Sequence, residues 1–172
     1  DLIRPGLVFV QNGEIYARAL AALALEGVLL VHVDKPPPKM QSLPWTELLA
    51  TKATDAVAKS VDAIEPKTVG KFLFTSGSTK LPKAVINTQR MWCANQQQMR
   101  QSMPVLAEDP LVLIDWLPWN HTFGGNHNVG MTIYNGGTLY IDDGKPTPAL
   151  MGETLRNLRE IAPTVYFNVP TG

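Results

Sequence analysis

The segment Phe72-Leu-Phe-Thr-Ser-Gly-Ser-Thr-Lys-Leu-Pro-Lys-Ala-Val-Ile86 joins two apolar runs through a loop of small hydroxyl residues. Its hydroxyl groups lie within five residues of one another, on Thr75, Ser76, Ser78 and Thr79. Gly77 permits a backbone conformation in which successive N–H groups point into one concavity. Lys80 and Lys83 add positive charge to the same loop. These features predict a binding site for a chain of phosphate groups.

Two common phosphate-binding motifs do not match this loop. A Walker loop needs a second glycine five residues after the first, followed by lysine, and that position holds Pro82. A dinucleotide-binding fingerprint needs three glycines where a strand meets a helix, and this loop has one glycine between two strands. Hydroxyls, backbone amides and lysines must then hold the phosphates without a helix dipole. On composition alone, a plain Ser/Thr-rich hairpin is the competing interpretation.

Predicted strands and helices alternate along the whole chain. Short runs of apolar and β-branched residues predict strands at 6–10, 28–33, 71–74, 84–87, 111–115, 138–141 and 164–167. Apolar spacing and helix-end signals predict helices at 14–26, 45–50, 53–64, 89–103 and 149–161, and one that starts at 122 or 125 and ends near 134. The strand–helix–strand order of residues 6–33 is a βαβ unit, which implies a parallel sheet. The predicted fold class is α/β, with parallel or mixed sheets covered by helices.

Several side chains on these elements are predicted to be structural. We expect Thr88 to cap the helix at 89–103 and the helix at 53–64 to face mostly solvent. His32 lies on a strand that is predicted to be buried. The glutamines at 96–98 are predicted on the surface of their helix, and the methionines at 91, 99 and 103 are predicted to fill the core.

Composition excludes several classes of protein. Lys plus Arg and Asp plus Glu number 15 each, which argues against a general binder of nucleic acid or of acidic membranes. The longest apolar run, 17–33, is interrupted by Arg18, Glu26 and His32 and is too broken to span a membrane. Cys93 is the single cysteine, so a disulfide framework and a CxxC zinc site are excluded, and no metal-binding residues are predicted. One cysteine fits a reducing compartment, so we expect a cytoplasmic protein.

A second candidate site follows the strand at 111–115, in Leu117-Pro-Trp-Asn-His-Thr-Phe-Gly-Gly125. His121 lies at the predicted strand-to-helix corner, where it can donate a hydrogen bond to a carboxylate. His127 and Asn128 lie near the start of the next predicted helix, where polar residues would suit a substrate with a phenolic or hydroxyl end. The candidate pocket residues are Trp119, Asn120, His121, Phe123, Gly124 and His127. Structural hydrogen bonding, helix capping and core packing are the competing interpretations.

Residues 74–85 resemble the phosphate loop of the adenylate-forming superfamily, which includes acyl- and aryl-CoA synthetases, luciferases and peptide-synthetase adenylation domains. Two positions depart from the family pattern, because Lys80 and Ala84 stand where glycine is usual. Residues 117–125 resemble the next core motif of this superfamily. Within the superfamily, the stretches 71–94 and 115–146 are most similar to feruloyl-CoA synthases.

This resemblance implies a two-step reaction that uses ATP, Mg²⁺ and CoA. A carboxylic acid attacks the α-phosphate of ATP, and the thiol of CoA then displaces AMP from the acyl adenylate. The resemblance places His121 at the reacting carboxylate and makes Lys83 a further catalytic residue. It assigns the phosphates to Thr75, Ser76, Gly77, Ser78, Thr79, Lys80 and Lys83. The implied partners are small molecules: the acid, ATP and CoA.

Two other functions remain open at this point. One is a fatty-acyl or other acyl-CoA ligase of the same superfamily. The other is a non-catalytic nucleotide-binding homologue, which Lys80 and Ala84 favour.

The resemblance also predicts that residues 1–172 are a fragment of the AMP-binding N-terminal domain. The chain starts at Asp1 and ends in the loop-like Val-Pro-Thr-Gly172. The family's adenine, ribose and Mg²⁺ contacts and its small C-terminal domain with a catalytic lysine would lie beyond residue 172. We therefore expect the fragment alone to be inactive.

Overall fold

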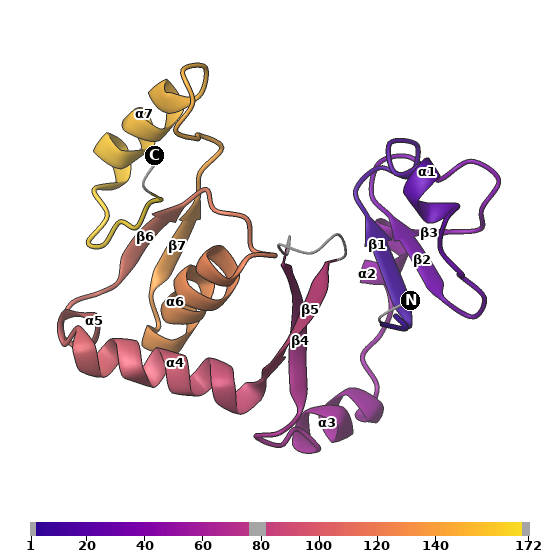
Figure 1. Ribbon diagram of the computed structural model, residues 1–172, viewed down its shortest axis with the longest axis horizontal. Helices are drawn as coiled ribbons and strands as arrows, with labels where there is room; N and C mark the ends of the chain where they lie inside the picture. The colour runs from indigo at the N-terminus through magenta and orange to yellow at the C-terminus, as the bar shows by residue number, and fades with distance from the viewer. Residues whose placement is uncertain (1–2, 76–81, 170–172) are drawn as a thin grey trace. The chain divides into compact units, whose positions relative to one another are not determined.

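The computed structural model describes residues 3–75 and 82–169 (Figure 1). The chain divides into two compact units, Asp1–Ala63 and Ile64–Gly172. The predicted phosphate-loop residues 76–80 lie outside the described residues.

The first unit is built on a parallel sheet in the order β1-β2-β3. These strands span Leu7–Val10, Leu29–His32 and Leu43–Pro44. Val31, in the central strand, is fully buried, and His32 beside it places its Nδ1 atom 3.0 Å from the Ser42 hydroxyl oxygen. The parallel pairing of β1 with β2 confirms the predicted βαβ unit, and the buried, hydrogen-bonded His32 confirms its structural role.

The helix predicted at 14–26 is much shorter in the structure, where α1 covers only Ala17–Leu20. The Asn12 side chain accepts hydrogen bonds from the N–H groups of Glu14 and Ile15, and these bonds form a turn before the helix. Leu20 is the one buried residue of α1, whereas Ile15 is 74% exposed. A helix with so little buried surface gains little from packing, and short helices are marginal without it. The predicted length was therefore wrong.

Two further helices complete the first unit. Helix α2 spans Trp45–Leu49, and α3 spans Asp55–Asp62. No residue of α3 is buried, which confirms the prediction of a solvent-facing helix.

The second unit begins with an antiparallel hairpin of β4 (Val69–Thr75) and β5 (Lys83–Thr88). Thr75 pairs with Lys83, so these two residues mark the base of the predicted phosphate loop. Helix α4 (Gln89–Ser102) follows directly, and the Thr88 hydroxyl accepts the N–H of Met91 at 3.3 Å, as the sequence predicted. The short helix α5 (Val105–Glu108) was not predicted.

The rest of the second unit contains a parallel pair, β6 (Val112–Asp115) and β7 (Thr138–Ile141). Between them the chain forms a π-helix, η1 (Thr122–Val129), which continues into α6 (Gly130–Asn135). Helix α7 (Met151–Ile161) comes last. The strand predicted at 164–167 is reduced to one bridge between Val165 and Leu113.

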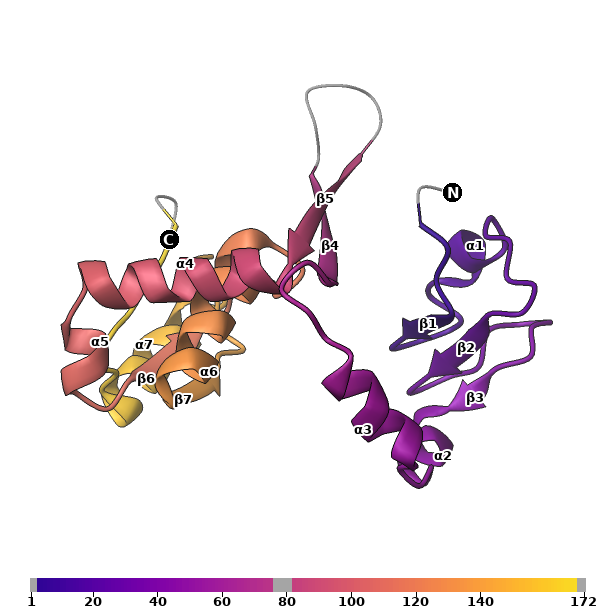
Figure 2. The same cartoon turned by 90° about the horizontal axis from the view of Figure 1, so that it is seen from below.

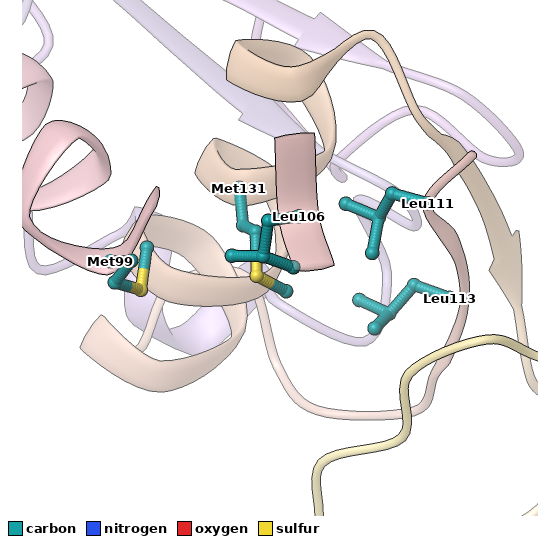
Figure 3. Packing of buried hydrophobic residues seen from close by; sticks show 5 residues of the cluster. All are labelled: Met99, Leu106, Leu111, Leu113 and Met131. Carbon is teal, nitrogen blue, oxygen red and sulfur yellow. The ribbon is translucent and has the colours of Figure 1, made fainter. Parts of the chain in front are cut away.

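The core of the second unit joins α4, α5, β6 and α6. Five buried side chains form it: Met99, Leu106, Leu111, Leu113 and Met131 (Figure 3). Helices α4 and α6 lie side by side in both overall views (Figure 1 and Figure 2). This packing holds α4 against the segment that follows β6, where the candidate site lies.

The structure therefore has mixed α/β architecture, with parallel and antiparallel sheets as predicted. Among residues 3–75 and 82–169, no helix combines the length and the apolar character that crossing a membrane requires.

Removing the Thr88 cap should destabilise the second unit. Thr88→Ala loses the hydrogen bond to the Met91 N–H, and we expect a loss of about 1 kcal/mol in the free energy of unfolding. Urea unfolding of the protein measures this loss. Thr147→Ala is the matched control in the same unit, because the Thr147 side chain is exposed. Equal losses in the two variants would contradict the capping role.

Candidate functional site

The candidate site lies at the corner where β6 gives way to η1. His121 is the last extended residue before η1, and its Nδ1 atom accepts the N–H of Phe123 at 3.3 Å. A neutral imidazole that accepts through Nδ1 carries its proton on Nε2. The Nε2–H group of His121 is therefore a hydrogen-bond donor, as recognition of a carboxylate requires.

Two pockets of the second unit meet at this corner. The larger pocket has a volume of about 430 Å³. It is lined by Asn87, Met91, Trp92, Asn95, His121, Thr122, Phe123, Asn126 and His127. The smaller pocket, of about 150 Å³, is lined by Leu73, Phe74, Thr75, Val85, Asn120, His121 and Thr122. His121 and Thr122 line both pockets, so the corner links them.

The structure brings together several residues that the sequence singled out. Thr75, Asn120 and His121 line the smaller pocket, although they come from the hairpin and from the corner after β6. His121, Phe123 and His127 line the larger pocket. Lys83 is exposed at the start of β5, opposite Thr75.

Other predicted residues are placed elsewhere or lie outside the described part of the chain. Trp119 and Gly124 line neither pocket. Gly124 is buried, and a Cβ atom there would lie 2.5 Å from the Pro118 carbonyl oxygen, so close packing accounts for this glycine. The remaining predicted phosphate-binding residues, Ser76, Gly77, Ser78, Thr79 and Lys80, fall outside the described residues. Their roles stay predictions.

The sequence did not predict the polar contacts that anchor η1. The Asn126 carbonyl oxygen accepts hydrogen bonds from Trp92 Nε1 at 3.2 Å and from Gln96 Nε2 at 2.7 Å. The Asn126 amide nitrogen donates to Asn87 Oδ1 at 2.9 Å. Gln96 is buried, so its predicted surface position was wrong. The spacing of Trp92 and Gln96 on one face of α4 was the available signal for this contact.

A glycine of α6 makes this contact between α4 and η1 possible. A Cβ atom at Gly130 would lie 2.4 Å from Trp92 Nε1 and 2.5 Å from Gln96 Nε2. Any larger residue at this position would displace both donors. The wall of the larger pocket therefore depends on a close helix–helix approach.

Aromatic rings form a wall beside the larger pocket. The ring of His127 lies edge-on to Phe123 and to Phe167, with centroid separations of 5.1 and 4.6 Å. Such edge-to-face contacts are favourable and hold rings in defined orientations. A flat ring is the kind of ligand that this wall fits.

Burial shifts the pKa values of two ionisable groups near the site. Asp115 is 2% exposed, and burial raises its pKa, although the Leu117 N–H and the Asn128 amide partly offset this by hydrogen bonding to the carboxylate. The Lys71 ammonium lies 3.8 Å from the ring centroid of Trp92, and burial lowers its pKa.

The described residues hold no group of three or more His, Cys, Asp and Glu side chains that could bind a metal ion. A larger, mostly apolar pocket of about 650 Å³ lies in the first unit. It contains none of the predicted site residues.

A profile of the family described as AMP-binding enzyme matches residues 4–172. Among curated proteins, a methyl-dioxo-octahydro-indenyl-propanoyl:CoA ligase of Mycobacterium tuberculosis is 30% identical over 112 residues, covering 64% of this chain and 22% of that protein. A long-chain-fatty-acid–CoA ligase of Rattus norvegicus is 25% identical over 148 residues, covering 83% of this chain and 20% of that protein. The chain thus spans about a fifth of the length of these relatives.

Solved structures show the same fold. ATP-bound MatB from Rhodopseudomonas palustris superposes with a TM-score of 0.67 and 22% identity, over 97% of this chain and 30% of that one. The luciferase-like enzyme from the mealworm Zophobas morio gives a TM-score of 0.65 and 18% identity, over 98% of this chain and 37% of that one.

The buried Asp115 predicts a pH dependence of stability. Its pKa is raised in the folded protein, so the folded state binds a proton at pH values where the unfolded state, with a pKa of about 3.9, has lost it. The stabilisation due to this proton is full at low pH and disappears as the pH rises through the raised pKa. We therefore expect the free energy of unfolding of the wild type, minus that of Asp115→Asn, to fall as the pH rises through the raised pKa of Asp115. Urea unfolding of both proteins at several acidic pH values measures this difference. A difference that rises with pH would contradict the raised pKa of Asp115.

Proposed function

The chain belongs to the AMP-binding enzyme family, and we propose that the full-length protein is an acid–CoA ligase that activates an aromatic, feruloyl- or hydroxycinnamoyl-type acid. One observation carries this proposal. His121 lines both the smaller pocket, which is also lined by Thr75 at the base of the phosphate loop, and the larger pocket, which is also lined by Trp92 and Phe123. An enzyme that joins a carboxylate to a phosphate needs its two substrates to meet in this way.

In the proposed first step, a carboxylate oxygen of the acid attacks the α-phosphorus of ATP, and pyrophosphate leaves. In the second step, the sulfur of CoA attacks the acyl carbon, the thiol proton is lost, and AMP leaves. Negative charge is concentrated on phosphate and carboxylate oxygens throughout. Catalysis then consists mainly of positioning and electrostatic stabilisation.

The residues of this chain have distinct roles in the proposed reaction. The His121 Nε2–H group orients the carboxylate at the junction of the two pockets. Lys83 and the hydroxyl and amide groups of 75–80 hold the phosphates. Residues 3–75 and 82–169 hold no group of three or more His, Cys, Asp and Glu side chains that could bind a metal ion, and in the proposed reaction Mg²⁺ accompanies ATP.

The shape of the larger pocket supports an aromatic acid. Its volume of about 430 Å³ falls in the range of small-molecule sites, which is about 300–1,000 Å³. Its lining combines Phe123 and Trp92 with the polar groups of Asn87, Asn95 and His127. Asn87 is already hydrogen-bonded to Val85 and to Asn126, so Asn95 and His127 are the polar groups that a ring with a polar substituent could pair with and a plain alkyl chain could not.

A fatty-acyl–CoA ligase is the second candidate. The observation in its favour is the similarity to the long-chain-fatty-acid–CoA ligase of Rattus norvegicus.

We also propose that residues 1–172 form part of the AMP-binding N-terminal domain. The short span of this chain relative to its relatives supports this view. The adenine and ribose contacts and the small C-terminal domain would then come from other segments of the full-length protein.

The substrate class can be tested with the full-length protein. We expect AMP to form from ATP and CoA with ferulate or coumarate, and much more slowly with a long-chain fatty acid, because of the polar groups in the larger pocket. Chromatographic detection of AMP measures this. AMP formed only with the fatty acid would support the second candidate, and no AMP with any acid would indicate a non-catalytic homologue.

The role of Lys83 can be tested in the same assay. Lys83→Ala removes a charge-assisted contact to the phosphates, and we expect kcat/KM for ATP to fall about ten- to a hundredfold. Lys67→Ala is the matched control, because Lys67 is an exposed lysine that precedes β4. Equal kcat/KM values in the two variants would show that Lys83 does not contact ATP.

A further inference from the structure

A chain of hydrogen bonds runs from the end of β6 to the wall of the larger pocket. Asp115 Oδ1 accepts the N–H of Leu117 at 3.0 Å and the amide nitrogen of Asn128 at 2.9 Å. Asn128 Oδ1 lies 2.8 Å from Nδ1 of His127. Asp115 is 2% exposed and Asn128 is completely buried, so water cannot replace either partner.

The direction of these hydrogen bonds follows from the backbone donor. The Leu117 N–H can only donate, so Asp115 Oδ1 is an acceptor whether or not the other carboxyl oxygen carries a proton. Asn128 must therefore turn its NH₂ group toward Asp115 and its carbonyl oxygen toward His127. The opposite amide orientation would place two buried acceptor oxygens against each other without a proton between them.

This direction determines the tautomer of His127. Because Asn128 Oδ1 can only accept, the Nδ1 atom of a neutral His127 must carry the proton. Its Nε2 atom is then an acceptor, and it has no hydrogen-bond partner among the described residues. The edge-on contacts with Phe123 and Phe167 hold the ring in this orientation.

The two histidines of the larger pocket thus have opposite polarity. His121 accepts through Nδ1 and offers a donor, whereas His127 donates through Nδ1 and offers an acceptor. We propose that Asn128 and Asp115 are positioning residues that hold His127 as an acceptor for a hydroxyl group of the bound acid. This inference rests on the proposed function, and it makes His127 a determinant of specificity for acids that carry a hydroxyl group away from the carboxylate.

A spectrum of the free protein tests the tautomer without any substrate. The full-length protein is labelled with ¹⁵N in histidine, and the pH is raised until the histidine signals stop changing, so that the neutral imidazole is observed. The His127 signal is assigned by its loss in His127→Gln. We expect Nδ1 of His127 to be protonated and Nε2 to be unprotonated. A protonated Nε2 would overturn the proposal.

A matched pair of acids tests recognition of the hydroxyl group. For the wild type, we expect kcat/KM with 4-hydroxycinnamate to exceed that with cinnamate by about tenfold, the effect of one hydrogen bond. Asn128→Leu removes the amide, and the ratio should fall toward one. A ratio near one in the wild type, or an unchanged ratio in Asn128→Leu, overturns the proposal.

The variant Asn128→Asp tests whether residue 128 acts through its hydrogen bonds to Asp115 and His127, because it keeps the size of the side chain. Two facing carboxyl groups share a proton, so the new carboxyl can donate to Asp115 and still accept from His127 Nδ1. We therefore expect this variant to keep both the tautomer and the preference for 4-hydroxycinnamate. Loss of both in a folded Asn128→Asp protein contradicts the proposed direction of the hydrogen bonds.

The failure of this inference is distinct from the failure of the proposed function. AMP formation with neither acid contradicts the proposed function, and the ¹⁵N spectrum still decides the tautomer. AMP formation with both acids at equal kcat/KM contradicts only the role of His127.

Discussion

A buried carboxylate at the end of β6 determines how the site is built. Asp115 is almost completely removed from water, and a buried charge without partners would be strongly destabilising. Its partners come from the two segments that follow, the Leu117 N–H at the corner and the Asn128 amide in η1. These bonds tie the π-helix to the strand that precedes it. The loop between them, with His121, is thereby held at the meeting point of the two pockets.

The π-helix has a further consequence for the pocket wall. Within η1, the Asn126 carbonyl oxygen accepts hydrogen bonds from two side chains of α4, Trp92 and Gln96. The same residue reaches β5 through Asn87. The consecutive elements β5 and α4 and the distant η1 therefore line one pocket. In this arrangement, the proposed acid-binding pocket and the proposed phosphate loop are parts of one connected second unit.

Much of this organisation could be predicted from local sequence. The hairpin, the Thr88 cap and the first βαβ unit follow from residue patterns that act over a few positions. Features that depend on distant partners could not be predicted in this way. Helix α1 is short because it buries only Leu20, and Gln96 is buried because Asn126, thirty residues away, accepts its hydrogen bond. His121 was identified by resemblance, and its shared position between two pockets needed the structure.

In the proposed function, His121 lies where a carboxylic acid and the phosphates of ATP meet. The most direct measurement is a crystal structure of the full-length protein with a non-hydrolysable analogue of the feruloyl adenylate. We predict that the feruloyl ring occupies the pocket lined by Phe123 and His127, with His121 Nε2 within hydrogen-bond distance of the acyl oxygen. An analogue bound away from both pockets, or with its ring remote from Phe123 and His127, would contradict the account.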